Sequence, residues 1–374
     1  MSMKTKLHLI IMSLVLLFVA GGQSVCLAAE SWSYPTTKPT NPFAGGDGSK
    51  WNPYRIDNAQ QLANFSYMVT KKGENYEDKY FVLTNDITLN DNVLNASGTG
   101  LRYDVSNYKE WTPIGDRSVW DYGIFKGIFD GQGHTIRGMV CPKSNERKNT
   151  GLFETIEYAT IKNINMEDCC IKDDDAKKSS NFGILCGEAW NTCTIINCTI
   201  SKSAIIIKSE LDVCVGGILG SFRSIKPLHI SNCSFNGYIS FRQDDYYKFW
   251  FAGKCIGGIL GFNNEGKTEL HFNNCSSSGD IDIYCSHDNE KYYYYIGGLG
   301  GNLHSEHAFF SNCVSSMNIN IDSPNSGIGC CDVGGIVNYV DTKRFFSNCV
   351  YLGTIRVGYA GSPAKMEELW VCGL

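Results

Sequence analysis

The chain has 374 residues, a formal charge of −5 at pH 7, 43% hydrophobic residues, 39 glycines and 17 cysteines. Its length suits one elongated domain or two compact ones. Because the basic residues are scattered and the overall charge is mildly acidic, the sequence lacks the electrostatic footprint of a nucleic-acid-binding protein. We therefore expect no nucleic acid as a partner.

Residues 1–29 have the pattern of a secretory signal peptide. Two lysines precede an apolar run over residues 7–20, and small residues then predict cleavage after Ala28 or Ala29. The apolar run is too short to span a membrane, and no transmembrane segment is predicted downstream. The residues before Cys26 lack the lipoprotein pattern, so we expect no lipid anchor there. The protein is predicted to be exported, and thus secreted, periplasmic or at the cell surface.

Residues 30–110 are predicted to form an N-terminal capping segment. Asp57 or Asn58 can cap a helix that runs from about Ala59 to Lys71, and the next segment alternates like a strand. One side of this helix is apolar, with Leu62, Phe65 and Met68. A helix laid across the open end of a stacked structure would cover its apolar interior, as the terminal unit of a repeat protein must.

Residues 111–360 contain an internal repeat with two landmarks that keep the same step of 32 to 42 residues. The first is a glycine-led apolar segment at Gly151, Gly183, Gly217, Gly258, Gly298 and Gly335. The second is an asparagine at Asn163, Asn197, Asn232, Asn274, Asn312 and Asn348. One unit of three short strands cannot bury its own apolar side, but stacked units can, so the period predicts an all-β parallel β-helix. An immunoglobulin-like sandwich, the competing fold, does not require such a repeat.

Each landmark has an expected structural role. The glycine pairs are predicted to turn with positive φ, and the asparagines to occupy left-handed corners where their amides bond to the asparagines of neighbouring units. A cysteine follows five of the six corners and is predicted to point inward as a free thiol, at Cys198, Cys233, Cys275, Cys313 and Cys349. No Cys-x-x-Cys pair with histidine partners is present, so we expect no metal site and no cofactor.

The best-preserved repeat, Gly257 to Ile283, reads GGILGFNNEGKTELHFNNCSSSGDIDI. This stretch resembles the GLUG motif, which combines a glycine pair, a turn, an Asn-Cys-like strand and a closing Gly-x-[Val/Ile]. Similar stretches recur across residues 183–357, and residues 45–90 and 111–139 are similar to the region that precedes such repeats in secreted proteins of Bacteroidetes type. The resemblance implies a right-handed parallel β-helix on an exported or surface protein, often assigned to adhesion.

Some IgA-cleaving metalloproteases carry GLUG repeats beside a catalytic domain with a His-Glu-x-x-His helix. The nearest sequence here is His304-Ser-Glu306-His307, which lies at a predicted strand turn, so the resemblance does not imply protease activity. Asp130 and His134 are likewise interpreted as residues of tight turns, where Asp and Gly predominate, and not as catalytic groups. Residues 361–374 form a predicted closing segment, with a short helix over residues 363–370.

Two insertions before the glycine pairs of neighbouring repeats are rich in aromatic and acidic residues. Because the repeats stack, we expect these insertions to lie on one flank, where aromatic rings and carboxylates suit a glycan or a partner protein. The alternative is that the rings only cover an apolar edge of the stack. The candidate ligand-binding residues are Asp244, Asp245, Tyr246, Tyr247, Trp250, Glu290, Tyr292, Tyr293 and Tyr294.

Asp280 and Asp282 are predicted to point outward together from one strand, because Ile281 and Ile283 point inward. Their spacing of about 6.5–7 Å is close to that of the paired carboxylates of an inverting glycosidase. The leading hypothesis is a non-enzymatic, adhesin-like module that binds glycan or a host or partner protein. A polysaccharide hydrolase or lyase that uses Asp280 and Asp282 is the first alternative, and a purely structural surface or stalk component is the second.

Overall fold

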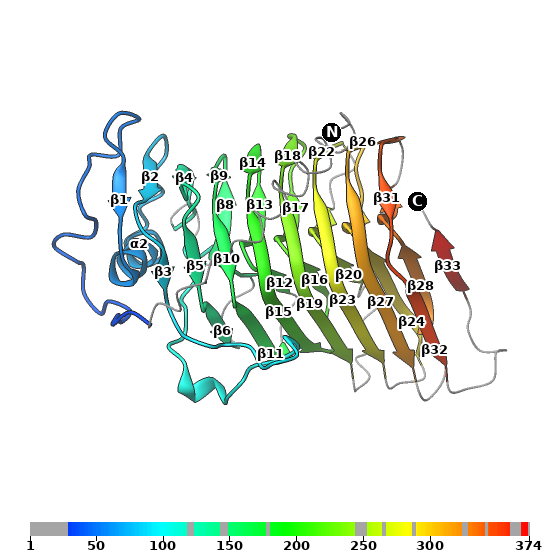
Figure 1. Cartoon of the computed structure of the whole chain (residues 1–374). Helices are drawn as coiled ribbons and strands as arrows, with labels where there is room; N and C mark the ends of the chain where they lie inside the picture. The colour runs from blue at the N-terminus through cyan, green and yellow to red at the C-terminus, as the bar shows by residue number, and fades with distance from the viewer. Residues whose placement is uncertain are drawn as a thin grey trace, which may run out of the picture.

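The computed structural model describes residues 29–117, 123–142, 149–176, 180–243, 253–263, 267–285, 289–323, 328–340, 343–359 and 368–372. Over these residues the fold is all-β, with parallel sheets and a single α-helix, as the repeat predicted. Figure 1 shows the strands of successive repeats side by side along an elongated body, with the helix at the N-terminal end.

The α-helix is α2 (Ala59–Lys72), close to its predicted bounds. The side chain of Asn58 accepts from the backbone N–H of Gln61 at 3.0 Å, and Gly73 ends the helix in the left-handed region with φ of 69°. The apolar side of α2 is buried, and the Phe65 ring stacks on that of Phe81 at 4.4 Å. The helix therefore covers the first strands of the stack, as a terminal cap should.

Two long sheets carry the strands on either side of the corner asparagines. Sheet 1 has nine strands, in the order β1 (Tyr54–Ile56), β2 (Tyr80–Leu83), β4 (Ile128–Asp130), β9 (Thr160–Lys162), β14 (Cys193–Ile196), β18 (Leu228–Ser231), β22 (Glu269–Asn273), β26 (His307–Ser311) and β30 (Lys343–Ser347). Sheet 2 has eleven strands, namely β3 (Ile87–Thr88), β5 (Thr135–Arg137), β10 (Asn165–Glu167), β15 (Thr199–Ser209), β19 (Ser234–Gln243), β23 (Ser276–Cys285), β27 (Val314–Ser323) and β31 (Val350–Tyr351), with β6 (Val140–Pro142), β11 (Cys170–Ala176) and β32 (Ile355–Tyr359) alongside.

Two shorter sheets hold the strands on either side of the glycine pairs. Sheet 3 has seven strands, in the order β33 (Glu368–Cys372), β28 (Ile328–Gly334), β24 (Asn289–Gly297), β20 (Gly253–Gly257), β16 (Val213–Gly216), β12 (Ser180–Gly183) and β7 (Asn149–Thr150). Sheet 4 has six strands, in the order β29 (Val337–Val340), β25 (Gly300–Leu303), β21 (Leu260–Asn263), β17 (Leu219–Arg223), β13 (Cys186–Trp190) and β8 (Phe153–Glu157).

Each central repeat therefore contributes four strands rather than the predicted three. In one repeat the chain runs through β16, β17, β18 and β19 before β20 pairs with β16 in parallel register. The apolar segment around the glycine pair is divided between sheets 3 and 4, because the chain changes direction there. The predicted unit counted these two strands as one.

The glycine pairs are required for a different reason from the one predicted. None of Gly217, Gly258 and Gly298 has a positive φ. A Cβ on Gly217 would instead lie 2.2 Å from the carbonyl oxygen of Gly258, and one on Gly258 would lie 2.2 Å from that of Gly298. The expectation of a positive-φ turn was wrong, and close approach of backbones in successive repeats is what excludes a side chain. We call this line of contacts the glycine seam.

The corner asparagines match their prediction. Asn163, Asn197, Asn232, Asn274, Asn312 and Asn348 all have φ of 52–53°. The amide of Asn232 donates to the side-chain oxygen of Asn197 at 2.9 Å, and the amide of Asn274 donates to that of Asn232 at 3.0 Å. Asparagine tolerates the left-handed region, and the stacked amides bond to one another between repeats.

The cysteines that follow these corners point into the core as free thiols. Cys198, Cys233, Cys275 and Cys313 are at most 1% exposed, and Cys349 in the last repeat is half-buried. Each thiol lies within hydrogen-bond distance of the carbonyl oxygen two residues before it, 3.2 Å for Cys233 and Ser231. Burial, and then the neighbouring Cys198 thiol, raise the pKa of Cys233 well above its usual value.

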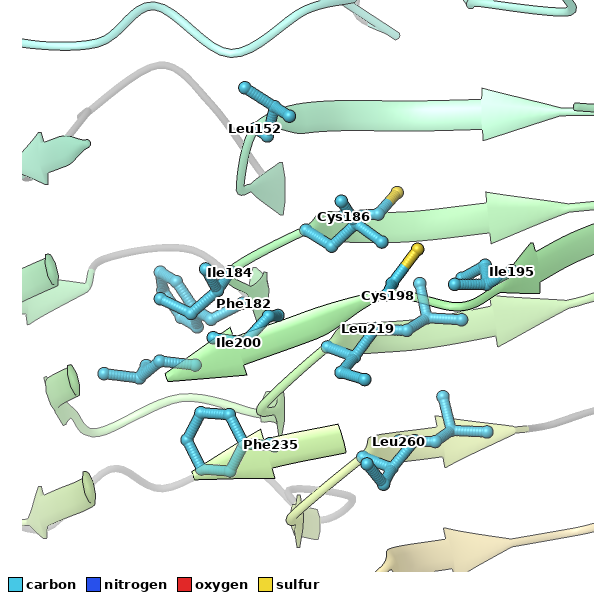
Figure 2. Packing of buried hydrophobic residues seen from close by; sticks show 14 of the residues in the cluster. Leu152, Phe182, Ile184, Cys186, Ile195, Cys198, Ile200, Leu219, Phe235 and Leu260 are labelled. Atoms are coloured by element: carbon cyan, nitrogen blue, oxygen red, sulfur yellow. The ribbon is translucent and has the colours of Figure 1, made fainter. Parts of the chain in front are cut away.

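The core is one continuous apolar column. Figure 2 shows side chains from successive repeats in the interior, with Cys198 near Ile195 and Ile200.

The short helix predicted at the C-terminal end of the chain is wrong in part, because Glu368–Trp370 belong to strand β33, which pairs with β28. Residues 363–367 of that predicted helix lie outside the described residues.

Candidate functional site

The C-terminal halves of strands β19, β23 and β27 of sheet 2 present a polar outer face. In β23, Ile281 and Ile283 are buried, whereas Asp280 and Asp282 are half-buried on the opposite side of the strand. The predicted outward orientation of the two carboxylates is therefore confirmed. The same alternation holds in the neighbouring strands, so Tyr238 and Ser240 of β19, and Asn318 and Asn320 of β27, lie beside the two aspartates in register.

Both carboxylates are held by side chains of the adjacent repeats. Asp280 accepts a hydrogen bond from the amide of Asn318 at 3.0 Å. Asp282 accepts from the amide of Asn320 at 2.8 Å and from the hydroxyl of Tyr238 at 2.9 Å. Burial, together with donation to Asp282, raises the pKa of Tyr238 to about 12, so the hydroxyl stays protonated as a donor. The result is a fixed network of hydroxyl, amide and carboxylate groups across three strands.

A long connection within the expected capping segment crosses the start of this face. Residues 91–108, which we call the strap, include the short 3₁₀ helix η1 (Val105–Asn107). The carboxylate of Asp168 accepts from the backbone N–H of Val93 at 2.7 Å and from that of Leu94 at 2.9 Å. Burial raises the pKa of Asp168 in spite of these two donors. An apolar cluster completes the attachment, in which Val93 and Leu94 pack with Val140, Cys170 and Ala204.

An open groove of about 950 Å³ lies between the strap and sheet 2. One wall is the strap over residues 99–107, and the other is formed by Lys172 and Asp174 of β11 with Ile206 of β15. Figure 1 shows the strap, in cyan, along the edge of the body beside β6 and β11. We call this feature the strap groove. The strap groove could not be predicted from the sequence, because the strap carries no repeat landmark and is attached by residues far away in the chain.

The strap groove combines an aromatic ring with balanced charges. Tyr103 is 55% exposed, and the guanidinium of Arg102 lies 5.4 Å from the centre of its ring. On the opposite wall, the ammonium of Lys172 and the carboxylate of Asp174 are 3.1 Å apart. An exposed ring bordered by paired charges offers both a stacking surface and hydrogen-bonding groups to a polar ligand.

Only the last residues of the predicted aromatic flank lie within the described part of the chain. Asp244, Asp245, Tyr246, Tyr247 and Trp250 lie outside the described residues, and so do the side chains of Glu290 and Tyr292. Tyr293 is 49% exposed, and its ring lies parallel to that of Tyr295 at 6.3 Å. Tyr294 is 1% exposed, and its hydroxyl donates to Gln243 at 2.7 Å. Tyr294 is thus a core residue and not a ligand-binding one, because strand alternation turns it inward.

A second outer row, on sheet 1, was not predicted. The rings of His229, His271, Phe309 and Phe345 occupy one register position in four successive strands and stack at 4.6, 4.8 and 4.8 Å. Burial, and then the adjacent His271, lower the pKa of His229. The signal in the sequence was the recurrence of a ring two residues before each Asn-Asn or Ser-Asn pair, which the repeat landmarks did not include.

Asp130 is the last residue of strand β4 and holds the turn that follows, so it was assigned one residue too far along. Its carboxylate accepts from the backbone N–H of Gln132 at 2.9 Å and from the amide of Asn163 at 2.9 Å, and Gln132 has a φ of 52°. Within the part of the chain that the structure describes, no three His, Cys, Asp or Glu side chains gather as metal ligands would. None of the described helices has the length and apolar character to cross a membrane.

Comparison with known proteins shows the fold but no family. No family model matches the chain. The structure is similar to a crystal structure from Bacteroides ovatus titled "a putative immunoglobulin A1 protease", with a TM-score of 0.55, 17% sequence identity, and coverage of 92% of this chain and 91% of that one. This likeness concerns the fold alone.

One sequence relative is a protein of Evansella cellulosilytica named "Putative Gly-rich membrane protein". It is 33% identical over 125 residues, which is 33% of this chain and 12% of the relative. The chain therefore corresponds to a small part of that relative's length.

Proposed function

We propose that the protein is an exported, right-handed parallel β-helix of the GLUG-repeat type, and that it binds a glycan of a surface or partner in the strap groove without catalysing a reaction. The strap groove is the observation that carries the proposal, since it places the exposed Tyr103 ring opposite the Lys172–Asp174 pair in a hollow of about 950 Å³. Sugar rings stack on aromatic side chains through their apolar faces, while their hydroxyls bond to polar side chains of this kind.

Several observations support the remaining parts of the proposal. Strands of successive repeats pair in parallel register in all four sheets, as stacked coils of a β-helix would. Residues 1–29 read as an export signal, and a relative of part of the chain bears the name of a membrane protein. Asp280 and Asp282 each accept a hydrogen bond from an asparagine amide, an arrangement suited to fixed binding groups. The aromatic insertions around Tyr247 and Trp250 remain a proposed extension of the binding surface.

The test is a glycan array probed with the chain lacking residues 1–29, followed by titration of the Tyr103→Ala variant. We expect loss of the stacked ring to weaken binding about tenfold or more. Tyr158→Ala is the matched control, since Tyr158 is 54% exposed and lies outside the groove lining. Thermal unfolding establishes that both variants fold. Equal binding by the two variants would exclude the strap groove as the site.

A further inference from the structure

The wall of the strap groove that sheet 2 forms continues beyond the strap as a straight row of side chains. Lys172, Ile206, Ser240, Asp282 and Asn320 occupy one register position in β11, β15, β19, β23 and β27. Neighbouring parallel strands are about 4.8 Å apart, so the four steps from Lys172 to Asn320 cover about 19 Å. Under the strap, Cys170 and Ala204 are fully covered, whereas Ser240, Asp282 and Asn320 are half-buried and accessible. We call these five residues the floor row.

The charges along this path are balanced, which favours a neutral ligand over a charged one. Two basic residues, Arg102 and Lys172, and two acidic residues, Asp104 and Asp174, line the strap groove, so their formal charges sum to zero. Further along, Asp280 and Asp282 accept bonds from neutral amide and hydroxyl groups. The same outer face also carries Asp322 and three basic residues, Lys208, Arg242 and Arg356, so its formal charges sum to zero as well. A polyanion laid along the floor row would meet the Asp280 and Asp282 carboxylates, and this face has no net positive charge to offset the repulsion. A neutral ligand has no such cost and can donate hydroxyl protons to them.

The strand pairing also disfavours an extended peptide. The strands β15, β19 and β23 are paired on both sides, so their backbone N–H and C=O groups are used within sheet 2. A peptide could not join the sheet there as an added strand, which is the usual way in which an extended chain binds β-structure. Recognition must come from side chains. Those available are hydroxyl, amide and carboxylate groups, with the Tyr238 and Tyr284 rings beside the floor row. Two basic side chains, Lys208 and Arg242, lie on the same outer face next to Tyr284.

We propose that the ligand is a neutral, linear glycan that enters the strap groove at Tyr103 and runs across β15, β19 and β23 to Asn320. This inference rests on the proposed function of the strap groove and adds the ligand's charge, shape and length. One end of the glycan stacks on Tyr103, and the units that follow bond to Ser240, Asp282 and Asn320. The binding site is therefore about 19 Å long, and oligosaccharides too short to reach Asn320 leave its far end empty.

The experiment is calorimetric titration with neutral gluco-, manno-, xylo- and galacto-oligosaccharides from disaccharide to hexasaccharide, and with oligogalacturonides of the same lengths. We expect the affinity for at least one neutral series to rise with length and to level off once the chain spans about 20 Å. Asn320→Ala should weaken the longest member about three- to tenfold, as loss of one hydrogen bond does, and leave the disaccharide unchanged. Tyr103→Ala should weaken every member.

Asn236→Ala is the control for Asn320→Ala, because Asn236 is an exposed asparagine in the first half of β19, away from the floor row. If Asn320→Ala and Asn236→Ala bind the hexasaccharide equally, or if oligogalacturonides bind more tightly than every neutral series, the inference is overturned. In that case the proposed function still stands, provided that Tyr103→Ala lowers binding on the array. If Tyr103→Ala has no effect on any glycan, the proposed function itself fails.

Discussion

The glycine seam and the outer face of sheet 2 are built from the same repeats, but the seam accepts only glycine whereas the outer face accepts many residue types. In the seam, Gly217, Gly258 and Gly298 recur because any Cβ would collide with the backbone of the next repeat. On the outer face, one register position holds Ile206, Ser240, Asp282 and Asn320 in turn, because side chains there are only half-buried. At positions where the backbones of successive repeats are in contact, the side chain is therefore restricted to glycine. At half-exposed positions the side chain can vary, and such positions can form a binding site.

The largest expected effect is a substitution in the seam. In Gly258→Ala the new methyl group would lie 2.2 Å from the Gly298 oxygen and 2.6 Å from the Cβ of Ser277, so the repeats must separate. We expect the free energy of unfolding to fall by about 3 kcal/mol, at the upper end of overpacking effects. Urea unfolding measures it. Gly358→Ala, whose nearest neighbour would be 3.6 Å away, should change stability by less than about 0.5 kcal/mol. Similar losses in both variants would contradict the role of the seam.

The corner asparagines should show an intermediate effect that separates backbone strain from hydrogen bonding. Asn232→Gly keeps the φ of 53° available but removes the bonds to Asn197 and Asn274, and should cost about 1 kcal/mol. Asn232→Ala adds left-handed strain and should cost about 1 kcal/mol more. Thermal unfolding of the two variants tests this order. If alanine were tolerated as well as glycine, the corner would not depend on the conformational tolerance of asparagine.

The smallest expected effect is on the outer face, at Glu167. Its carboxylate accepts from Lys202 at 2.8 Å and from Arg137 at 3.0 Å, and these bonds lower its pKa below the usual 4.5. A carboxyl with a lowered folded pKa stabilises the fold above its unfolded pKa, and this contribution disappears as the pH falls through the folded value. Glu167→Gln should therefore lower stability by at most about 1 kcal/mol at pH 7, and the difference should disappear once the pH has fallen through the lowered pKa of Glu167. A difference that persisted at the lower pH would require another cause.

Many local features of this fold follow from short stretches of sequence. The bounds of α2, the left-handed φ of Asn232, the inward thiol of Cys275 and the outward carboxylates of Asp280 and Asp282 were all predicted correctly. Each depends on neighbours within a few residues, or on the alternation of a strand, so that the local pattern is sufficient. The same reasoning placed Tyr294 on the surface, because its position in the alternation could not be assigned within a run of four tyrosines.

The errors arose where one pattern is compatible with two structures. A glycine-led apolar segment looks the same whether it forms one strand or two strands on either side of a seam, so three strands per repeat were predicted instead of four. The glycines were assigned to positive φ, the commonest reason for glycine at a turn, although contact between repeats is what excludes a side chain. At the C-terminus, residues 368–370 pair with β28, a partner that no local propensity can reveal.

The sequence by itself determined that this protein is a stack of repeats, because a period of 32 to 42 residues with two landmarks must bring equivalent residues together. Only the tertiary structure decided where the stack offers a site. The strap groove depends on the Asp168 carboxylate meeting the N–H groups of Val93 and Leu94, which are 75 and 74 residues away in the chain. A contact that occurs once, between distant segments, leaves no period in the sequence.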